Sequence, residues 1–410
     1  MDDLVLDTSW NAVSHVTRDF DALAAVAECM AVVRSRGEPI AGLIFYFTQA
    51  HDPAELAEVL SAEVGDIPTV AASVQGVTSQ GHVEEDGYLL GVFAWTGRVD
   101  VTVHCIEDLP RATFEKGVDL GRAITELPNR QASFVFYDPL GGVNARSFLR
   151  GFAEVLPKHL LFGAATGGPW GKRVATYQFD GQRLLQRALV CLTVGGDMTV
   201  VSAATTGTVP AGIRMTVTQC EDNAILELDG RPALQAWHNQ LDETEMMTME
   251  SMSSLALGIE RGGPGEETWA VLAPFGYDAV RSAIILQSDV AVGDVVEMHR
   301  RSPAIIFERV RAMAEKLRAE VVGREVVAVL GFECGARTSP FLGLDASLAE
   351  NLILQEALGT DVPWLGLLAW GEVVPVEHGA EFFNYTYPLA VLCRSRGESS
   401  LLDDSDEVHA

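Results

Sequence analysis

Apolar residues in this chain gather in short runs that alternate with amphipathic stretches. The first clear case has an apolar run at residues 43–47, a helical pattern at 52–64 and a second apolar run at 69–73. Asp52 and Pro53 suit the start of the helix, because an Asp side chain caps free backbone N–H groups and proline fits the first helical position. The pattern predicts a strand–helix–strand unit.

The same order of elements occurs twice more. A second copy covers residues 133–137, 144–156 and 160–165, and a third covers residues 326–330, 347–358 and 364–370. Uninterrupted apolar runs suit strands that are covered on both faces. Units of about thirty residues are typical of crossovers between parallel strands. The sequence therefore predicts an α/β fold with related domains that are built from such crossovers by internal duplication.

The segment between the second and third copies has a different pattern. Residues 177–185 indicate a hairpin, and the Asp180-Gly181 pair at its tip favours a type I′ turn. Further strands are expected at residues 188–194, 198–204, 214–220 and 224–228, and a helix is expected at residues 231–241. This part of the chain is predicted to add an antiparallel, β-rich segment to the crossovers.

Length and composition suggest how these units are grouped. The chain has 410 residues, which is enough for two or three structural units. We expect one domain over residues 15–230, a second over 231–395 and an acidic, disordered tail over 396–410. Polar, methionine-rich residues 243–254 and the glycine-rich residues 262–265 fit either a junction between domains or a surface insertion.

Charge and cysteine usage exclude several classes of protein. The net charge is −28, which disfavours binding to nucleic acid or to anionic lipid. Apolar runs stay below the length of about 18 residues that a membrane crossing needs, and the first residues lack the pattern of a secretory signal. The six cysteines are widely spaced and none belongs to a CxxC pair, which favours a reducing cytoplasm.

A group of polar residues follows the strands of the third copy. Residues 331–337 read Gly-Phe-Glu-Cys-Gly-Ala-Arg, a Gly-Glu pair follows the next strand, and an Asn-Tyr-Thr sequence comes later. This ordered set resembles the C-terminal FIST domain, in which a strand ends in Cys, an Arg comes soon after, and Gly-Glu and Asn-x-Thr steps follow. The matching residues are Cys334, Arg337, Gly371, Glu372, Asn384 and Thr386.

The N-terminal half is similar to the other FIST domain, so that the resemblance covers roughly residues 15–395. Ser73 and Gly76 match the family after the first crossover, but Ala72 stands where many members have Cys. Phe383 stands where many members have His. These two differences concern the ligand more than the fold.

The resemblance implies a sensory role in bacterial signal transduction. It implies a non-catalytic cytoplasmic protein that binds a small ligand, such as an amino acid or a small carboxylate, and acts through a separate signalling protein. Some members of the family bind haem and sense nitric oxide, which is the first alternative. An enzyme that uses Cys334 as a nucleophile is the second.

The residue types at the motif support a ligand site. Arg337 and Glu372 follow two strand ends, and open α/β sheets bind ligands beyond the carboxyl ends of their strands. A guanidinium fits a carboxylate and a carboxylate fits an ammonium group, although the two side chains could instead pair with each other. Asn384 and Thr386, two positions apart on a strand, are expected to face one side and to bind ligand or cap a loop.

Further candidates lie after the strands of the other copies. Ser73 and Gly76 follow the first crossover, and Thr166 and Gly167 follow the second. Backbone amides of such glycine-containing turns can hold an anion, although glycines also serve simply to let a chain turn. All four are predicted ligand-binding residues.

Cysteine and histidine chemistry receives less support. Cys334 would need a neighbouring base or cation to become a thiolate, and a buried inert thiol is the simpler interpretation. None of the nine histidines forms an HxH or HxxxH pair, so no metal site is predicted. A haem needs only one axial histidine, for which His378 is the candidate. We expect no cofactor.

Overall fold

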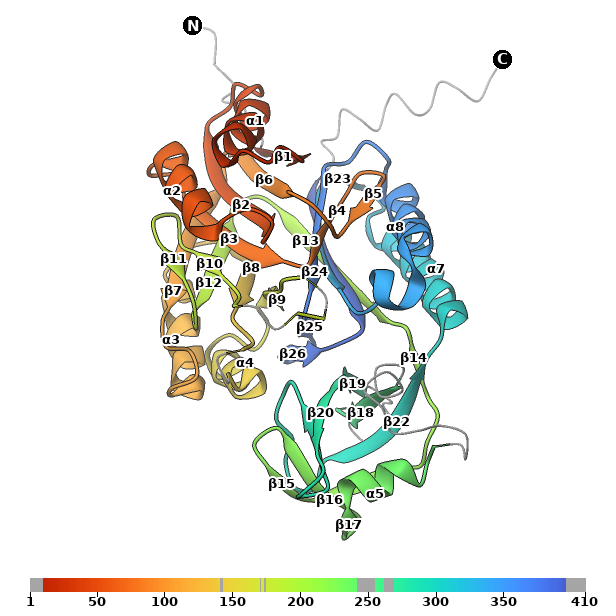
Figure 1. The fold of residues 1–410 in the computed structure, drawn as a ribbon. Helices are drawn as coiled ribbons and strands as arrows, with labels where there is room; N and C mark the ends of the chain where they lie inside the picture. Colours follow the sequence, from red (N-terminus) through yellow and green to blue (C-terminus); the bar gives the residue numbers. More distant parts are fainter. Residues whose placement is uncertain are drawn as a thin grey trace, which may run out of the picture.

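The computed structural model describes residues 10–140, 143–169, 171–172, 175–241, 255–261 and 269–395 (Figure 1). The first predicted crossover is β2 (Ile40–Thr48), α2 (Pro53–Val64) and β3 (Thr69–Val74), with α1 (Ala22–Arg34) before it. The two strands are parallel. Asp52 caps α2 as predicted, because its Oδ1 accepts from the N–H groups of Ala54 (2.8 Å) and Glu55 (3.1 Å).

The other two predicted crossovers are also present. The second consists of α3 (Thr113–Thr125), β8 (Arg130–Tyr137), α4 (Ala145–Val155) and β9 (Leu160–Ala165), and the third of α7 (Pro303–Glu320), β23 (Arg324–Cys334), α8 (Leu344–Leu358) and β24 (Trp364–Ala369). In both, the two strands pair in parallel. The predicted α/β class is confirmed.

Each crossover forms the centre of a six-stranded sheet, and the three sheets have equivalent strand orders. The first sheet, β1-β6-β2-β3-β10-β11, also contains β1 (Trp10–Thr17), β6 (Leu90–Gly97), β10 (Gln178–Phe179) and β11 (Leu184–Leu185). The second, β7-β12-β8-β9-β25-β26, also contains β7 (Asp100–Ile106), β12 (Leu189–Gly195), β25 (Glu372–Val376) and β26 (Gly379–Phe383). The third, β13-β27-β23-β24-β4-β5, also contains β13 (Thr199–Thr206), β27 (Thr386–Ser395), β4 (Gly76–Ser79) and β5 (His82–Glu84).

The three copies are interlocked by their last two strands. After β3 the chain leaves the first sheet and adds β4 and β5 to the third sheet. In the same way β10 and β11 pass from the second copy to the first sheet, and β25 and β26 pass from the third copy to the second sheet. Strands from both sides of the predicted boundary near residue 230 therefore share sheets, and the boundary itself stays a prediction.

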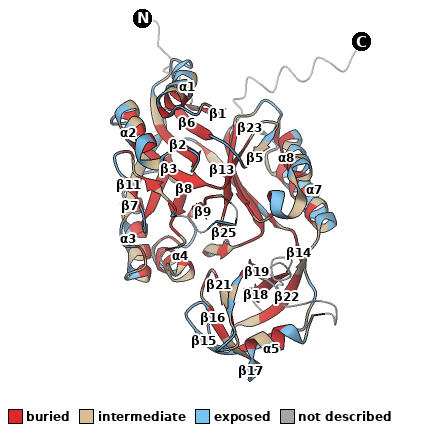
Figure 2. Ribbon diagram, viewed as in Figure 1, coloured by how far each residue is buried: buried red, intermediate tan, exposed pale blue. Residues whose placement is uncertain are grey.

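The sheets enclose one aromatic core. The Phe332 ring of the third sheet stacks on three rings of the second sheet, with centroid distances of 6.2 Å to Phe134, 6.4 Å to Phe136 and 6.1 Å to Phe162. The outer faces are covered by α1 and α2, by α3 and α4, and by α7 and α8, respectively. The strands are therefore buried on both sides (Figure 2), which explains their uninterrupted apolar runs.

The predicted β-rich segment divides between the sheets: its hairpin and next two strands, β10 to β13, join the three six-stranded sheets, and only its later part enters a separate antiparallel lobe, at the bottom of Figure 1. Its strands are β14 (Thr208–Pro210), β15 (Met215–Glu221), β16 (Ala224–Leu228), β17 (Arg231–Pro232), β18 (Leu255–Glu260), β19 (Trp269–Leu272), β20 (Pro274–Asp278), β21 (Ala283–Leu286) and β22 (Val295–Arg301). The predicted segments 243–254, 262–265 and 396–410 lie outside the described residues.

Two local predictions, one for α5 in the lobe and one for the β10–β11 hairpin of the first sheet, are wrong. The helix α5 covers only Ala233–His238, because Arg231 and Pro232 pair with β16 as β17. The hairpin of β10 and β11 has a loop of residues 180–183 in place of a type I′ turn, since Phe179 pairs with Leu184. The Asp180 carboxylate closes this loop by accepting from the N–H groups of Gln182 and Arg183.

The described helices differ from membrane-spanning helices. None of them has both the length and the apolar composition that such a crossing needs.

Candidate functional site

The predicted residues that follow the crossovers meet where the three copies exchange their strands. Ser73 Oγ donates to the Gly167 carbonyl oxygen at 2.9 Å, and Gly167 N donates to the Ser73 carbonyl oxygen at 2.9 Å. Ala165 N donates to the Gly371 carbonyl oxygen at 2.8 Å. The fold thus brings the predicted residues Ser73 and Gly167 into direct contact and places Gly371 against Ala165, the neighbour of Thr166.

Two predicted residues at this junction, Thr166 and Gly76, are held by contacts within the protein. Thr166 Oγ1 donates to the Tyr137 carbonyl oxygen and accepts from Gln178 Nε2 at 2.7 Å. A Cβ atom at Gly76 would lie 2.2 Å from the Glu84 carbonyl oxygen, so close packing of strands requires glycine there. These contacts give Thr166 and Gly76 structural roles, and ligand binding by them stays a prediction.

Glu372 lies beside the end of β23. Its side chain has no exposed surface, and its Oε2 accepts from Thr386 Oγ1 at 2.8 Å and from Thr386 N at 3.2 Å. Burial is the largest cause that raises the pKa of Glu372 to about 8, against which the Thr386 hydrogen bonds act. Gly371 precedes it, and a Cβ atom there would lie 2.4 Å from the Phe382 ring.

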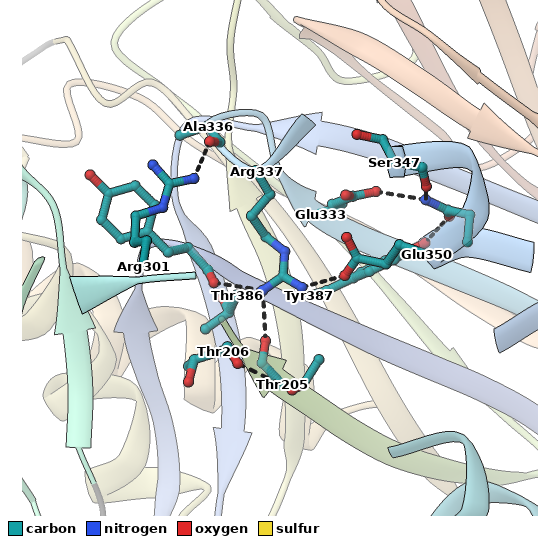
Figure 3. A network of polar contacts seen from close by, with 12 residues as sticks. Thr205, Thr206, Arg301, Glu333, Ala336, Arg337, Ser347, Glu350, Thr386 and Tyr387 are labelled. Atoms are coloured by element: carbon teal, nitrogen blue, oxygen red, sulfur yellow. Dashed lines mark hydrogen bonds and ion pairs between the residues drawn. The ribbon is translucent and has the colours of Figure 1, made fainter. Parts of the chain in front are cut away.

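Arg337 is also fully buried, but its partner differs from the one suggested by the sequence. It forms an ion pair with Glu350 of α8 in place of Glu372. Arg337 Nη1 donates to the carbonyl oxygens of Tyr385 (2.8 Å) and Thr205 (3.4 Å), as Figure 3 shows for the surroundings of this guanidinium. The guanidinium thereby joins α8 to the backbone of β13 and to the turn before β27.

The expectation that Asn384 and Thr386 face the same side of one strand is wrong. Tyr385 between them has a φ of 61°, so the chain turns there and β27 begins only at Thr386. The Asn384 side chain accepts from Ala273 N at 2.9 Å and donates to Gln287 Oε1 at 2.6 Å. Asn384 therefore caps a neighbouring loop, which was the alternative interpretation of this residue.

Sequence reasoning found Arg337 but missed the four buried polar residues around it under α8, and we call all five the acidic cluster: Glu333, Arg337, Glu350, Asn351 and Tyr387. The side chains of all five have no exposed surface. Asn351 Nδ2 donates to Glu333 Oε2 at 3.0 Å, and the Tyr387 hydroxyl donates to Asn351 Oδ1 at 2.5 Å. Burial, followed by the charge of Glu350, raises the pKa of Glu333 well above its usual range.

A pattern in α8 could have revealed this cluster. Polar residues recur at helical spacing on its buried face, as Ser347, Glu350 and Asn351. By contrast, Leu344 is 46% exposed and Leu352 is 37% exposed. The helix thus buries polar side chains beside Leu354 and Leu358 and exposes two leucines, which departs from the usual amphipathic arrangement.

The segment after β23 is held in place over the cluster from two directions. The Arg301 guanidinium of β22 lies 3.9 Å from the Phe341 ring centroid and 4.1 Å from that of Tyr385, and it donates to the Ala336 carbonyl oxygen. From the other side, Glu85 accepts from Ser339 N at 2.9 Å. Residues 335–343 therefore connect the β lobe with the third sheet.

His378 lies apart from this region. It occupies the turn between β25 and β26, where its side chain is 79% exposed and lies 3.9 Å from Glu377. Haem binding through His378 stays a prediction.

We expect the Cys334 thiol to resist alkylation in the native protein. It is 2% exposed, and burial and the nearby Glu372 raise its pKa far above the usual range, so little thiolate forms at neutral pH. Treatment with iodoacetamide at about pH 7.5 and peptide mass spectrometry should show slow labelling of Cys334 and faster labelling of the half-buried Cys220. All six cysteines should react in urea. Labelling of native Cys334 as fast as in urea would revive the nucleophile hypothesis.

The chain matches two domain models of one protein family. The model of the FIST N domain matches residues 42–231, and that of the FIST C domain matches residues 233–375. Uncharacterized proteins of Mycobacterium bovis and Mycobacterium tuberculosis are each 25% identical over 237 residues, which cover 56% of this chain and 59% of the relative. The match thus spans less than two thirds of these relatives. A structure of PurLQS from Thermotoga maritima aligns with 95% of this chain and 72% of that chain, at 8% identity and a TM-score of 0.24.

Proposed function

Because the chain belongs to the FIST family, whose domains are sensory domains of signalling proteins, we propose that it is a non-catalytic sensor of a small ligand. The proposed ligand is an amino acid or a small carboxylate. The sensor acts in the cytoplasm and signals through a separate protein. Its six free cysteines are consistent with a reducing compartment.

The observation that carries this proposal is the buried guanidinium beyond the ends of β23 and β24. Arg337 has no exposed surface, and Glu333 and Glu350 lie beside it. Buried charges are costly, and perturbed titratable groups gather at functional sites more than elsewhere. A guanidinium beside carboxyl groups matches the carboxylate and the ammonium group of an amino acid.

Binding without catalysis is supported by the protonation of the neighbouring groups. A thiolate is the nucleophilic form of cysteine, and the raised pKa of Cys334 keeps this thiol protonated at neutral pH. The charge of Glu372 acts in the same direction. We propose no cofactor for this function. The haem alternative is tested by reconstitution with haem and absorption spectroscopy, in which a Soret band of the purified protein would support it.

Ligand entry requires movement of residues 335–343, because the cluster beneath them is closed. The contacts of this segment with Arg301 and Glu85 connect any such movement to the β lobe and to the loop after β5. A sensor needs such a link, since a ligand changes the conformation only where it contacts the two states differently.

A thermal-shift screen of amino acids and small carboxylates tests the proposed function. A ligand that binds only the folded protein adds about 2.7 kcal/mol to its stability at a hundred times the dissociation constant. At least one compound is therefore expected to raise the melting temperature, and a screen without any stabilising compound would contradict the sensor function.

The site is tested with any compound found in that screen. Arg337→Lys keeps the charge but loses the planar fork, and it is expected to weaken binding at least tenfold in calorimetry. The matched control is Arg34→Lys on the surface, whose ion pair with Glu63 is far from the cluster and should leave affinity unchanged. Equal affinity of the two variants would place the ligand elsewhere.

A further inference from the structure

The acidic cluster occupies a place that is apolar in the other two copies. On the outer face of the first sheet, Phe47 at the end of β2 packs under α1 and α2, and on that of the second sheet Tyr137 at the end of β8 packs under α4. The corresponding strand of the third sheet, β23, has Glu333 before its end. Since two copies keep the same architecture with apolar contacts, the fold itself does not require carboxyl groups here.

The helices show the same difference. The buried faces of α2 and α4 consist mainly of apolar side chains, namely Leu56, Ala57, Leu60 and Val64 in α2 and Ala145, Phe148, Leu149 and Phe152 in α4. The buried face of α8 consists of Ser347, Glu350, Asn351, Leu354, Gln355 and Leu358. Burying polar groups costs free energy unless every one of them is hydrogen-bonded. The third copy thus carries a polar layer that the other copies avoid.

The charges within this layer do not balance when both carboxyl groups are ionised. Glu333 and Glu350 would contribute two negative charges and Arg337 one positive charge, all without exposed surface. An unpaired buried charge is strongly unfavourable, so the cluster needs one more positive charge. In the free protein a proton on Glu333 supplies it, because burial raises the pKa of this carboxyl well above its usual range.

The hydrogen bonds leave one oxygen of each carboxyl group without a donor. Glu333 Oε2 accepts from Asn351 and Glu350 Oε1 accepts from Arg337. The opposite oxygens, Glu333 Oε1 and Glu350 Oε2, are buried and have no hydrogen-bond partner among the described residues. Figure 3 shows both carboxyl groups on the same side of Arg337. Such a pair of acceptors suits a group with several N–H donors and one positive charge.

We propose that Glu333 and Glu350 bind the ammonium group of a small primary amine or amino acid, which replaces the proton of the Glu333 carboxyl. The proposal rests on the proposed sensor function and specifies the atoms that hold its ligand. On binding, the carboxylic acid gives its proton to solvent and becomes a carboxylate. The ammonium group, the Arg337 guanidinium and two carboxylates then sum to zero charge.

Charged and polar groups from several elements surround Glu333 and influence its protonation. Glu350 and Asn351 face it from α8, Arg337 from the turn after β23, Glu85 from the loop after β5, and Tyr387 from β27. Burial favours the protonated form of the Glu333 carboxyl, because it raises the pKa of this group well above the usual range. An ammonium ligand is therefore expected to bind more tightly as the pH rises, with release of about one proton.

Methylammonium chloride is the probe, compared at equal concentration with tetramethylammonium chloride and potassium chloride. Methylammonium has three N–H donors and tetramethylammonium has none. At about 100 mM the first is expected to raise the melting temperature by about 2 °C or more above both controls. Calorimetry in two buffers of different ionisation enthalpy should show the release of about one proton per bound methylammonium.

Variants locate the effect. Glu333→Gln imitates the protonated acid and can still accept from Asn351, so the fold should persist while the methylammonium effect and proton release are lost. Glu58→Gln, an exposed change on α2, should behave as the wild type. Equal melting temperatures in the three salts, or an unchanged response of Glu333→Gln, would overturn the proposal. If Glu333→Gln fails to fold, the number of protons that the wild type releases per bound methylammonium tests the proposal, and a value near zero would overturn it.

This experiment separates the inference from the proposed function. An amino acid that stabilises the wild type and Glu333→Gln equally, without proton release, would overturn the ammonium site and leave the sensor function intact. A flat screen of amino acids and carboxylates would contradict the function itself, whatever the response to methylammonium.

Discussion

Replacing Arg337 by alanine is expected to lower the free energy of unfolding by about 3–5 kcal/mol. The guanidinium is the ion-pair partner of Glu350, and both side chains are without exposed surface. Its removal leaves a buried carboxylate without its partner and frees the carbonyl oxygens of Tyr385 and Thr205 from their donor. Urea unfolding at about pH 7.5, followed by circular dichroism, measures the change.

An exposed ion pair is the matched control for Arg337→Ala. In the pair of Arg34 with Glu63, the side chains are 52% and 32% exposed, and Arg34→Ala should cost less than about 1 kcal/mol. The double change Arg337→Met with Glu350→Leu removes both charges and should recover much of the loss. A cost below about 1 kcal/mol for Arg337→Ala would mean that water reaches the cluster, contrary to the structure.

The second large effect is a loss of stability as the pH rises from about 4.5 to about 8, caused by Glu372. Burial raises the pKa of this carboxyl to about 8, while its ordinary value is 4.5. Between these values the folded state holds a proton that the unfolded state has lost, so the free energy of unfolding falls with rising pH. At about 1.4 kcal/mol per pKa unit, the total is on the order of 5 kcal/mol.

Glu372→Gln isolates this contribution from those of other buried acids. Glutamine cannot ionise, and its carbonyl oxygen can still accept from Thr386. Urea unfolding from pH 5 to pH 9 should show a smaller loss of stability in the variant than in the wild type. Parallel profiles for the two proteins would show that Glu372 titrates in the folded state as it does in the unfolded chain.

Local patterns in the sequence were sufficient to predict the three crossovers. Uninterrupted apolar runs identified β2, β8 and β23, and the Asp52-Pro53 pair identified the start of α2. These signals depend on residues close to one another in the chain and on burial of both strand faces, so they do not require knowledge of the partners. The ordered motif from Cys334 to Thr386 likewise indicated the family that both domain models confirm.

Predictions that depended on long-range partners were less accurate. The exchange of strands among the three sheets had no local signal, because the residue pattern of a short strand such as β4 does not depend on which sheet the strand joins. The turn at Tyr385 separated Asn384 from Thr386 although their spacing suggested one strand face. In each case the outcome depends on contacts between segments that are distant in sequence.

The candidate site shows where this limit lies. The sequence by itself determined the α/β class, the three crossovers and the presence of Arg337 and Glu372 after two strand ends, because hydrophobic periodicity and motif order are local properties. Only the tertiary structure decided that Arg337 pairs with Glu350 and that Glu372 binds Thr386. The physical reason is that a buried charge takes the partner that packing brings within reach, and that partner came from a helix face whose polar pattern faces inward.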